Sequence, residues 1–340
     1  MVKSTKRISL GSVRFKSRAA FTIGSIATAS MILSACSSSS ASSSSSTTSV
    51  ASSNSIAANY NLKGANITVG SLNFTEELIM GYITVDALKA AGANVTSKLD
   101  IAGVDTIRQA ELSGNIDMFP SYTGTGWVVY LKQTSSITNS ETLFRQLNAM
   151  DRAQNKIAWI GPSPFNDTYD IAANSAIAKQ YHITTISQLA KLVKTNPSVA
   201  TFCSTSSFAV RPDGLPGLES TYGFTFPSSN LKTEALGLIY SSLGSGSPCN
   251  FGETYSTDAR LISNHLTVLK DNKKFFPLYN GAVTVRLSVL NRYPAIGKLM
   301  QNVLSRLTTP VITQLNSQVD INGLPANVVA ANWLKQQGLS

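Results

Sequence analysis

Charged residues are scarce in this chain: Asp, Glu, Lys and Arg make up 14% of its 340 residues, whereas 43% of the residues are hydrophobic. So little charge argues against a solvated coiled coil, and so large an apolar share argues against disorder throughout. The chain has only two histidines and three cysteines, in no metal-ligand spacing, so we expect no metal and no other cofactor. It also lacks a glycine-rich phosphate loop, so it is not expected to power transport by itself.

The net charge of +10 is concentrated at the N-terminus. Six of the Lys and Arg residues lie within the first 18 residues, and no acidic residue accompanies them. The rest of the chain has no Lys/Arg cluster of the kind that follows a phosphate backbone. The sequence therefore does not predict a nucleic-acid partner.

The first 35 residues have the pattern of an export signal. Residues 1–18 are basic, and residues 19–35 are uncharged and largely apolar, which is typical of a secretory signal but short for a spanning helix. The segment ends in Leu33-Ser34-Ala35-Cys36, which resembles the bacterial lipobox. We expect 1–35 to be a lipoprotein signal peptide and Cys36 to carry the lipid on the outer face of the cell membrane. The alternative is an ordinary signal peptide with an incidental cysteine.

A segment rich in serine follows the signal. Residues 37–56 are nearly all Ser, Thr and Ala, with no charge and little to bury. Such a segment cannot offset its ordering entropy, so 36–64 is predicted to be a flexible tether, with folded structure beginning near Ala65. No later segment has 18 consecutive apolar residues, so the folded part is not expected to span a membrane.

The remainder alternates between strand and helix patterns, which predicts an α/β fold with its sites at strand ends and in loops. Capping residues at 73–77 begin a predicted helix that ends at Gly92. Strands are predicted at 67–70, 95–99, 116–119 and 199–203, and further helices at 106–112, 185–194, 235–243, 295–319 and 325–337.

Cys203 and Cys249 are the cysteines outside the leader. An exported protein folds in an oxidising compartment, so we expect a disulfide between them, the alternative being two buried free thiols. A catalytic thiol would need a base. The two histidines, His182 and His265, lie in no recognisable motif, so catalysis is not expected.

An ordered series of motifs resembles one known family. The series begins with "ITVGSLNFTEELIMGYI" and "GNIDMFPSYTGTGWVVYL" and continues with "PSPFNDTYDIA", "RPDGLPGL", "CNFGETYSTDARL", "LKDNKKFFPLYNGAVTVR" and "LNSQVDINGLPANVVAANWL". In this order, over residues 65–336, it is similar to the substrate-binding proteins of ABC importers for glycine betaine, choline and related quaternary amines. The resemblance implies a bilobed periplasmic-binding-protein-like fold of type II. Its lobes would be 65–165 plus 278–340, and 166–277, with the ligand between them.

The chemistry of such a ligand explains which residues the site needs. A trimethylammonium group has no N–H to donate, but several aromatic faces attract it, each by about 0.5–2 kcal/mol. The resemblance places Asp167 and Thr168 against the methyl groups through main-chain oxygen. It also places four tyrosines, each beside turn-forming residues, in the cage: Tyr122, Tyr169, Tyr255 and Tyr279.

The tail of a betaine is a carboxylate, which requires a cationic fork or hydroxyl donors. The resemblance offers Arg211 and Thr125 for it. Arg211 could equally be a surface charge paired with Asp213. Many family members carry a lysine where this chain has Leu72, which makes choline or another tail more plausible than glycine betaine.

The leading hypothesis is a lipid-anchored receptor that delivers a quaternary ammonium compound to a separate ABC permease and ATPase. One alternative is an extracellular enzyme on the same scaffold, which would need a nucleophile–base or metal constellation that we do not find. Another is an adhesion or structural lipoprotein, for which the tether would suit equally well. Quenching of tyrosine or tryptophan fluorescence by betaine or choline distinguishes the receptor from the adhesin.

Overall fold

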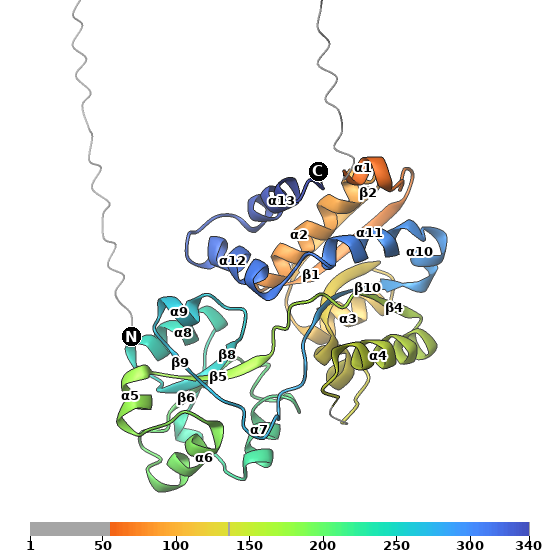
Figure 1. Ribbon diagram of the computed structural model, residues 1–340. Helices are drawn as coiled ribbons and strands as arrows, with labels where there is room; N and C mark the ends of the chain where they lie inside the picture. Colours follow the sequence, from red (N-terminus) through yellow and green to blue (C-terminus); the bar gives the residue numbers. More distant parts are fainter. Residues whose placement is uncertain (1–54, 135–136, 340) are drawn as a thin grey trace, which may run out of the picture. The chain divides into compact units, whose positions relative to one another are not determined.

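Two five-stranded mixed sheets form the framework of the protein (Figure 1). The computed structural model describes residues 55–134 and 137–339, which belong to one compact unit; the signal peptide and Cys36 lie outside the described residues. The first sheet has the order β2-β1-β3-β10-β4. Its strands are β1 (Asn66–Leu72), β2 (Asn94–Ile101), β3 (Met118–Tyr122), β4 (Ile157–Ile160) and β10 (Gly281–Arg286). Strand β1 runs parallel to β2 and β3, and β10 runs antiparallel to β3 and β4.

The second sheet has the order β7-β6-β8-β5-β9. Its strands are β5 (Tyr169–Ala173), β6 (Phe202–Ser204), β7 (Leu231–Thr233), β8 (Phe251–Tyr255) and β9 (Thr267–Leu269). Strand β6 runs parallel to β7 and β8, and β5 runs antiparallel to β8 and β9. The mixed sheets with helices between their strands confirm the predicted α/β class.

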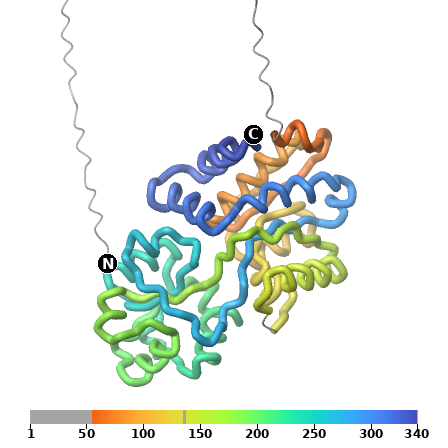
Figure 2. The backbone as a smooth tube through the Cα atoms, in the orientation of Figure 1, coloured from red at the N-terminus to blue at the C-terminus, as the bar shows by residue number. Residues whose placement is uncertain are grey.

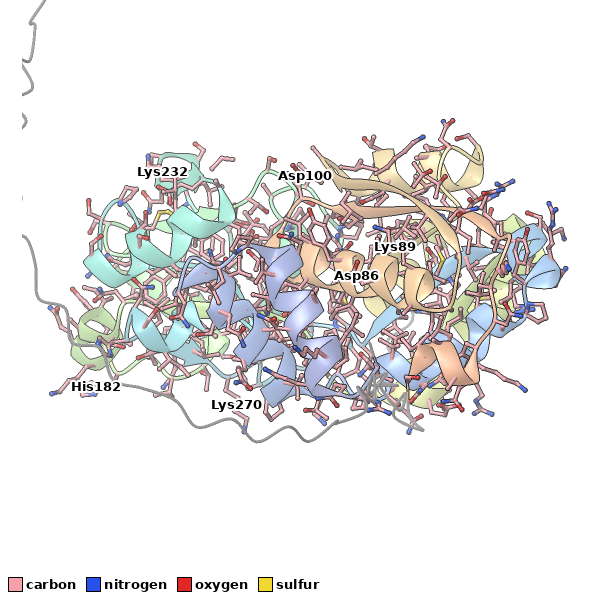
Figure 3. The ribbon with its side chains drawn as sticks, turned by 90° about the horizontal axis from the view of Figure 1, so that it is seen from above. Asp86, Lys89, Asp100, His182, Lys232 and Lys270 are labelled. Atoms are coloured by element: carbon pink, nitrogen blue, oxygen red, sulfur yellow. A yellow bond between two sulfur atoms is a disulfide. The ribbon has the colours of Figure 1, made fainter. Side chains whose placement is uncertain are left out.

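Helices cover both faces of the first sheet because its strands are apolar on both sides. Met118 on β3 packs into the core cluster shared with α2, and the next residue, Phe119, packs on the opposite face with Ile107 of α3. Helices α2 (Thr75–Ala90) and α11 (Ala295–Leu304) lie on one face, and α12 (Thr309–Asp320) and α13 (Ala326–Gln336) pack against α2. The other side carries α3 (Val104–Leu112), α4 (Ser140–Asn155) and the π-helix η1 (Thr125–Tyr130), and α10 (Leu287–Arg292) follows β10. Figure 3 labels Asp86 and Lys89 on α2.

The second sheet is built in the same way. Phe202 on β6 shares a core cluster with residues of α6 (Ile186–Thr195) and α7 (Leu215–Tyr222), whereas Cys203 packs on the opposite face with α8 (Leu236–Ser245). Cys203 and Cys249 form a disulfide there, and Cys203 lies in register with Lys232 of β7, which Figure 3 labels. The remaining elements are α5 (Ser175–Gln180), η2 (Ser228–Asn230) and α9 (Arg260–Ser263).

Two neighbouring segments connect the sheets, one between β4 and β5 and the other between β9 and β10 (Figure 2). Asn166 and Asn280 form a bridge between these segments, and the Asp167 N–H donates to the Tyr279 carbonyl at 3.0 Å. Residues near 167 and 279 are therefore held side by side between the two sheets.

The folded structure begins earlier in the chain than the composition predicts. A short helix, α1 (Ile56–Asn59), precedes β1 inside the segment expected to be tether, and the side chain of Ile56 is fully buried. Leu62 is also buried, and its N–H donates to the Ala91 carbonyl at 2.7 Å. The prediction that 56–64 is tether was therefore wrong, because these two apolar side chains complete the core beside α2.

Several other predicted bounds shift. The strand predicted at 116–119 is β3, the strand predicted at 199–203 is β6, and the helix predicted over 295–319 is divided into α11 and α12. The predicted side-chain cap of α2 is absent, because its N-cap is Phe74 and the Thr75 hydroxyl donates instead to Asp320 at 2.6 Å. None of the described helices is both long and apolar enough to cross a membrane.

Candidate ligand-binding site

Seven of the eight residues predicted from the sequence to contact the ligand line one cavity of about 810 Å³. The eighth, Thr168, is not among the lining residues, and its hydroxyl donates to the Pro277 carbonyl at 3.0 Å. The seven come from both sheets and from the segments between them, mostly where a strand begins or ends. Tyr122 ends β3, Tyr169 begins β5, Tyr255 ends β8, Tyr279 precedes β10, Thr125 begins η1, and Asp167 and Arg211 lie in loops.

Aromatic rings form one wall of the cavity. Tyr169 and Tyr255 lie opposite each other in antiparallel register, with ring centroids 4.9 Å apart. The Tyr279 ring stands nearly perpendicular to that of Tyr169 at 5.4 Å. Tyr122 joins this group through Phe74, whose ring lies 6.2 Å from Tyr122 and 6.3 Å from Tyr255. Phe74 was not predicted to be a site residue, although it lies inside the "NFTE" motif.

Carboxylates fix two of the tyrosine hydroxyls. The Tyr122 hydroxyl donates to Glu76 Oε1 at 2.9 Å, and the Tyr279 hydroxyl donates to Asp213 Oδ2. Burial raises the pKa of all four cage tyrosines, that of Tyr169 to about 12, so the rings stay neutral at physiological pH. A hydroxyl that donates to a carboxylate also holds its ring in one orientation, which preorganises the wall for a ligand.

One glycine of the "SYTGTG" motif permits this packing. A Cβ on Gly124 would lie 2.6 Å from the Tyr279 ring, which is shorter than any tolerable contact. The motif therefore brings the backbone that follows β3 directly against a cage tyrosine.

Arg211 forms an ion pair with Asp213 and also lines the cavity. Its Nε and Nη2 donate to the two oxygens of Asp213 at 2.8 and 2.6 Å, and both residues are buried. The guanidinium carbon lies 5.5 Å from the centroid of the Tyr169 ring. Nη1 makes no hydrogen bond to any described residue, so the two N–H groups of Nη1 are left for other partners.

At Leu72 the cavity is lined by an apolar side chain, and the cationic residues of the described lining are Arg211 and Arg260. Leu72 is 7% exposed and packs with Ile107 and Phe119, and its N–H donates to Glu77 Oε2 at 3.1 Å. Glu77 Oε1 has no hydrogen-bond partner in the described part of the chain, and burial raises the pKa of this carboxyl well above its usual range. This part of the cavity is thus built from an apolar side chain and a buried carboxyl group whose pKa is raised by desolvation.

Beneath the aromatic wall, two buried carboxyl groups meet at one hydroxyl. Thr257 Oγ1 lies 2.6 Å from Glu76 Oε2 and 2.7 Å from Asp167 Oδ1. Asn316 Nδ2 donates to Glu76 Oε2 at 2.7 Å. From the sequence, Glu76 was placed only in the first turn of α2. Thr257 and Asn316 lie inside two of the family-like motifs, but the sequence assigned no role to either of them.

Comparison with known proteins identifies the family. The profile of the substrate-binding domain of ABC-type glycine betaine transport systems, the OpuAC family, matches residues 65–336. The chain belongs to this family. The resemblance inferred from the ordered motifs is thereby confirmed, and the protein is a substrate-binding protein of the glycine betaine type of ABC importer.

Individual relatives of the chain support its membership of this family. A glycine-betaine-binding protein of Pseudomonas aeruginosa is 32% identical over 278 residues, covering 80% of this chain and 88% of the relative. The ergothioneine transport permease/ergothioneine binding protein EgtU of Helicobacter pylori is 29% identical, covering 80% of this chain and 48% of the relative. The structure of apo YehZ from Escherichia coli, 28% identical, superposes with a TM-score of 0.60 over 81% of this chain and 99% of that one. The fold is accordingly the bilobed α/β fold of periplasmic binding proteins, as predicted.

Proposed function

We propose that the cavity binds the trimethylammonium head of a quaternary ammonium compound against Tyr122, Tyr169, Tyr255 and Tyr279. The observation that carries this proposal is the wall of neutral aromatic rings, drawn from both sheets, with Tyr169 within 5.4 Å of two others. Neutral aromatic faces attract a diffuse cation and offer its methyl groups apolar contact. Phe74 adds a fifth face to the four that the sequence indicates.

The remaining site residues hold the rest of the ligand. Arg211 and Thr125 bind the tail, and the main-chain oxygen of Asp167 contacts the methyl groups. Because Asp213 pairs with Arg211 and Asp258 pairs with Arg260, a carboxylate tail meets less positive charge here than a free guanidinium would give. These features support choline, or a compound with a larger tail, over glycine betaine.

The size of the cavity favours a second candidate ligand. A volume of about 810 Å³ lies in the upper part of the range of about 300–1,000 Å³ that suits drug-sized ligands. Glycine betaine is much smaller than that. A larger betaine, such as the ergothioneine named for the Helicobacter pylori relative, fills more of the space.

Calorimetric titration of the purified protein with glycine betaine, choline, carnitine and ergothioneine tests the proposal. Tyr255→Ala should weaken the tightest of them by about 5–30-fold, because one aromatic face is lost. Tyr181→Ala is the matched control, since Tyr181 lies at the end of α5 and does not line the cavity. Absence of binding for all four compounds, or equal affinities in the two variants, would contradict the cage.

We further propose that Cys36 carries lipid, that the protein acts outside the cytoplasm and that it delivers its ligand to an ABC permease and its ATPase. The lobes that close on the ligand would be 65–165 plus 278–340, and 166–277. The "LSAC" motif and the serine-rich segment after it support the anchor. Cys36→Ser should release the protein into the medium or leave it unprocessed. A variant that remains membrane-bound at the mature size would show that the anchor lies elsewhere.

A further inference from the structure

The contact between Glu76, Thr257 and Asp167 cannot be made by three groups in their usual protonation states. Thr257 Oγ1 lies within hydrogen-bond distance of a carboxyl oxygen on each side, at 2.6 Å from Glu76 and 2.7 Å from Asp167. A hydroxyl has one hydrogen to donate. If both carboxyl groups were ionised, one of these contacts would bring two lone pairs together. One of the two carboxyl groups must therefore hold a proton and donate it to Thr257.

The hydrogen bonds on each side indicate which carboxyl group that is. Glu76 accepts from the Tyr122 hydroxyl at 2.9 Å and from Asn316 Nδ2 at 2.7 Å, in addition to the Thr257 hydroxyl. Three donors stabilise an ionised carboxylate. Among the described residues, the Asp167 side chain contacts only Thr257, through the hydroxyl and a longer 3.4 Å contact from the main-chain N–H. The proton thus belongs on Asp167, which donates to Thr257, which in turn donates to Glu76.

The surrounding charges agree with a single negative charge at this point. Neither carboxyl group forms an ion pair with a described cation. Arg260 lines a small cavity together with Glu76 and Asp167, but its Nε and Nη2 donate to Asp258, and it lies 3.5 Å from Asp320. Glu77, the next acidic neighbour on α2, is itself buried without a described cation, and Tyr122 is neutral. Burial raises the pKa of both members of the pair, that of Asp167 well above its usual range.

We propose that Glu76 and Asp167 share one proton through Thr257, with Glu76 ionised and Asp167 protonated, and that Glu76 is thereby the residue that selects a cationic ligand. Its charge reaches the cavity through Tyr122, because a phenol that donates to a carboxylate has a more electron-rich ring. Asp167 lines the cavity itself but carries no charge. The inference rests on the proposed function, and it names the group that sets charge selectivity there.

Two ligands of the same shape, one charged and one neutral, distinguish an effect of charge on binding from an effect of shape. Choline and 3,3-dimethylbutan-1-ol differ by one atom, a carbon in place of the charged nitrogen, and both are titrated against the full-length mature protein. Glu76→Gln should weaken choline by about tenfold or more while the neutral alcohol changes less than about threefold, because the amide removes the charge and keeps the shape of the side chain. The amide NH2 then faces the Tyr122 hydroxyl, which can accept as well as donate. Asp167→Asn is the comparison variant. Its amide can donate to Thr257 as the protonated acid does, so any loss of affinity should be equal for choline and the neutral alcohol, because this substitution removes no charge.

The opposite pattern, with choline weakened by Asp167→Asn and not by Glu76→Gln, would overturn the assignment. Equal weakening of both ligands by Glu76→Gln would also overturn it, because that result indicates only a role in positioning Tyr122. Side-chain carboxyl ¹³C NMR of the wild-type protein at neutral pH provides a second measurement, which does not depend on any variant being folded. One neutral and one ionised carboxyl signal are expected, and two ionised signals would refute the shared proton. Failure of wild-type protein to bind choline would instead contradict the proposed function, and the NMR result would still stand.

Discussion

Arg211 is the more buried of the two arginines that line the described cavity, the other being Arg260, but its pairing with Asp213 complicates the obvious experiment. Arg211→Ala alone would leave Asp213, which is 4% exposed, as a buried carboxylate held only by the Tyr279 hydroxyl. Breaking a buried ion pair from one side costs about 3–5 kcal/mol, and this loss would obscure any effect on the ligand. The informative variant is therefore Arg211→Gln combined with Asp213→Asn, which removes both charges and keeps two groups that can hydrogen-bond to each other.

The expected loss of glycine betaine affinity follows from the N–H donors of Arg211 that Asp213 leaves unoccupied. Nε and Nη2 of Arg211 are engaged by Asp213, so a ligand carboxylate gains a charge-assisted hydrogen bond from Nη1. Such a bond contributes about 1.5–3 kcal/mol, or about 10–150-fold in affinity. The double variant should therefore bind glycine betaine at least about tenfold more weakly and choline within about threefold of the wild type. Calorimetry with both ligands measures this, and a thermal unfolding curve checks that the variant is folded. If the two ligands weaken equally, Arg211 maintains the cavity wall and does not bind the tail.

Three further predictions concern single features of the protein. Tyr255→Phe and Tyr279→Phe should each bind the ligand more tightly than the corresponding alanine variant, because the ring survives. Tyr279→Phe should also lower the free energy of unfolding by about 1–2 kcal/mol, since Asp213 loses a donor; equal stability of the two phenylalanine variants in denaturant would argue against this. Reduction of the Cys203–Cys249 disulfide should cost about 2–4 kcal/mol in urea unfolding, and alkylation of both thiols in the unreduced protein would disprove the bridge. Burial raises the pKa of Glu253 from 4.5 to about 8, so the folded protein holds a proton there that the unfolded chain releases, and stability falls as pH rises across this window. Glu253→Gln should remove about 2–4 kcal/mol of that fall between pH 5 and 8, whereas an unchanged pH profile would place the titration on another group.

The class of fold and the four tyrosines that line the cavity could be predicted from the sequence. Strand and helix periods report which side chains are buried locally, and they survive in any tertiary arrangement that uses the same elements. The tyrosines could be predicted because the family resemblance selected them among the 11 tyrosines of the chain, each in a motif next to turn residues. The short helix α1 was not predicted, because Ile56 and Leu62 are too isolated in a polar segment to form a hydrophobic period. Their burial is explained only by their contacts beside α2.

The polar groups that meet inside the cavity wall are brought together by contacts between distant segments. Thr257 reaches Glu76 across 181 residues, and Asn316 reaches it across 240. No local pattern encodes such a contact, because a single threonine or asparagine has the same propensities wherever it lies. The protonation state of a buried carboxyl group depends on the donors and charges that other segments bring within about 4 Å of it. The ring wall was therefore foreseeable from the sequence, whereas the burial of the Arg211–Asp213 pair and the carboxyl pair behind Tyr122 became visible only once the chain was folded.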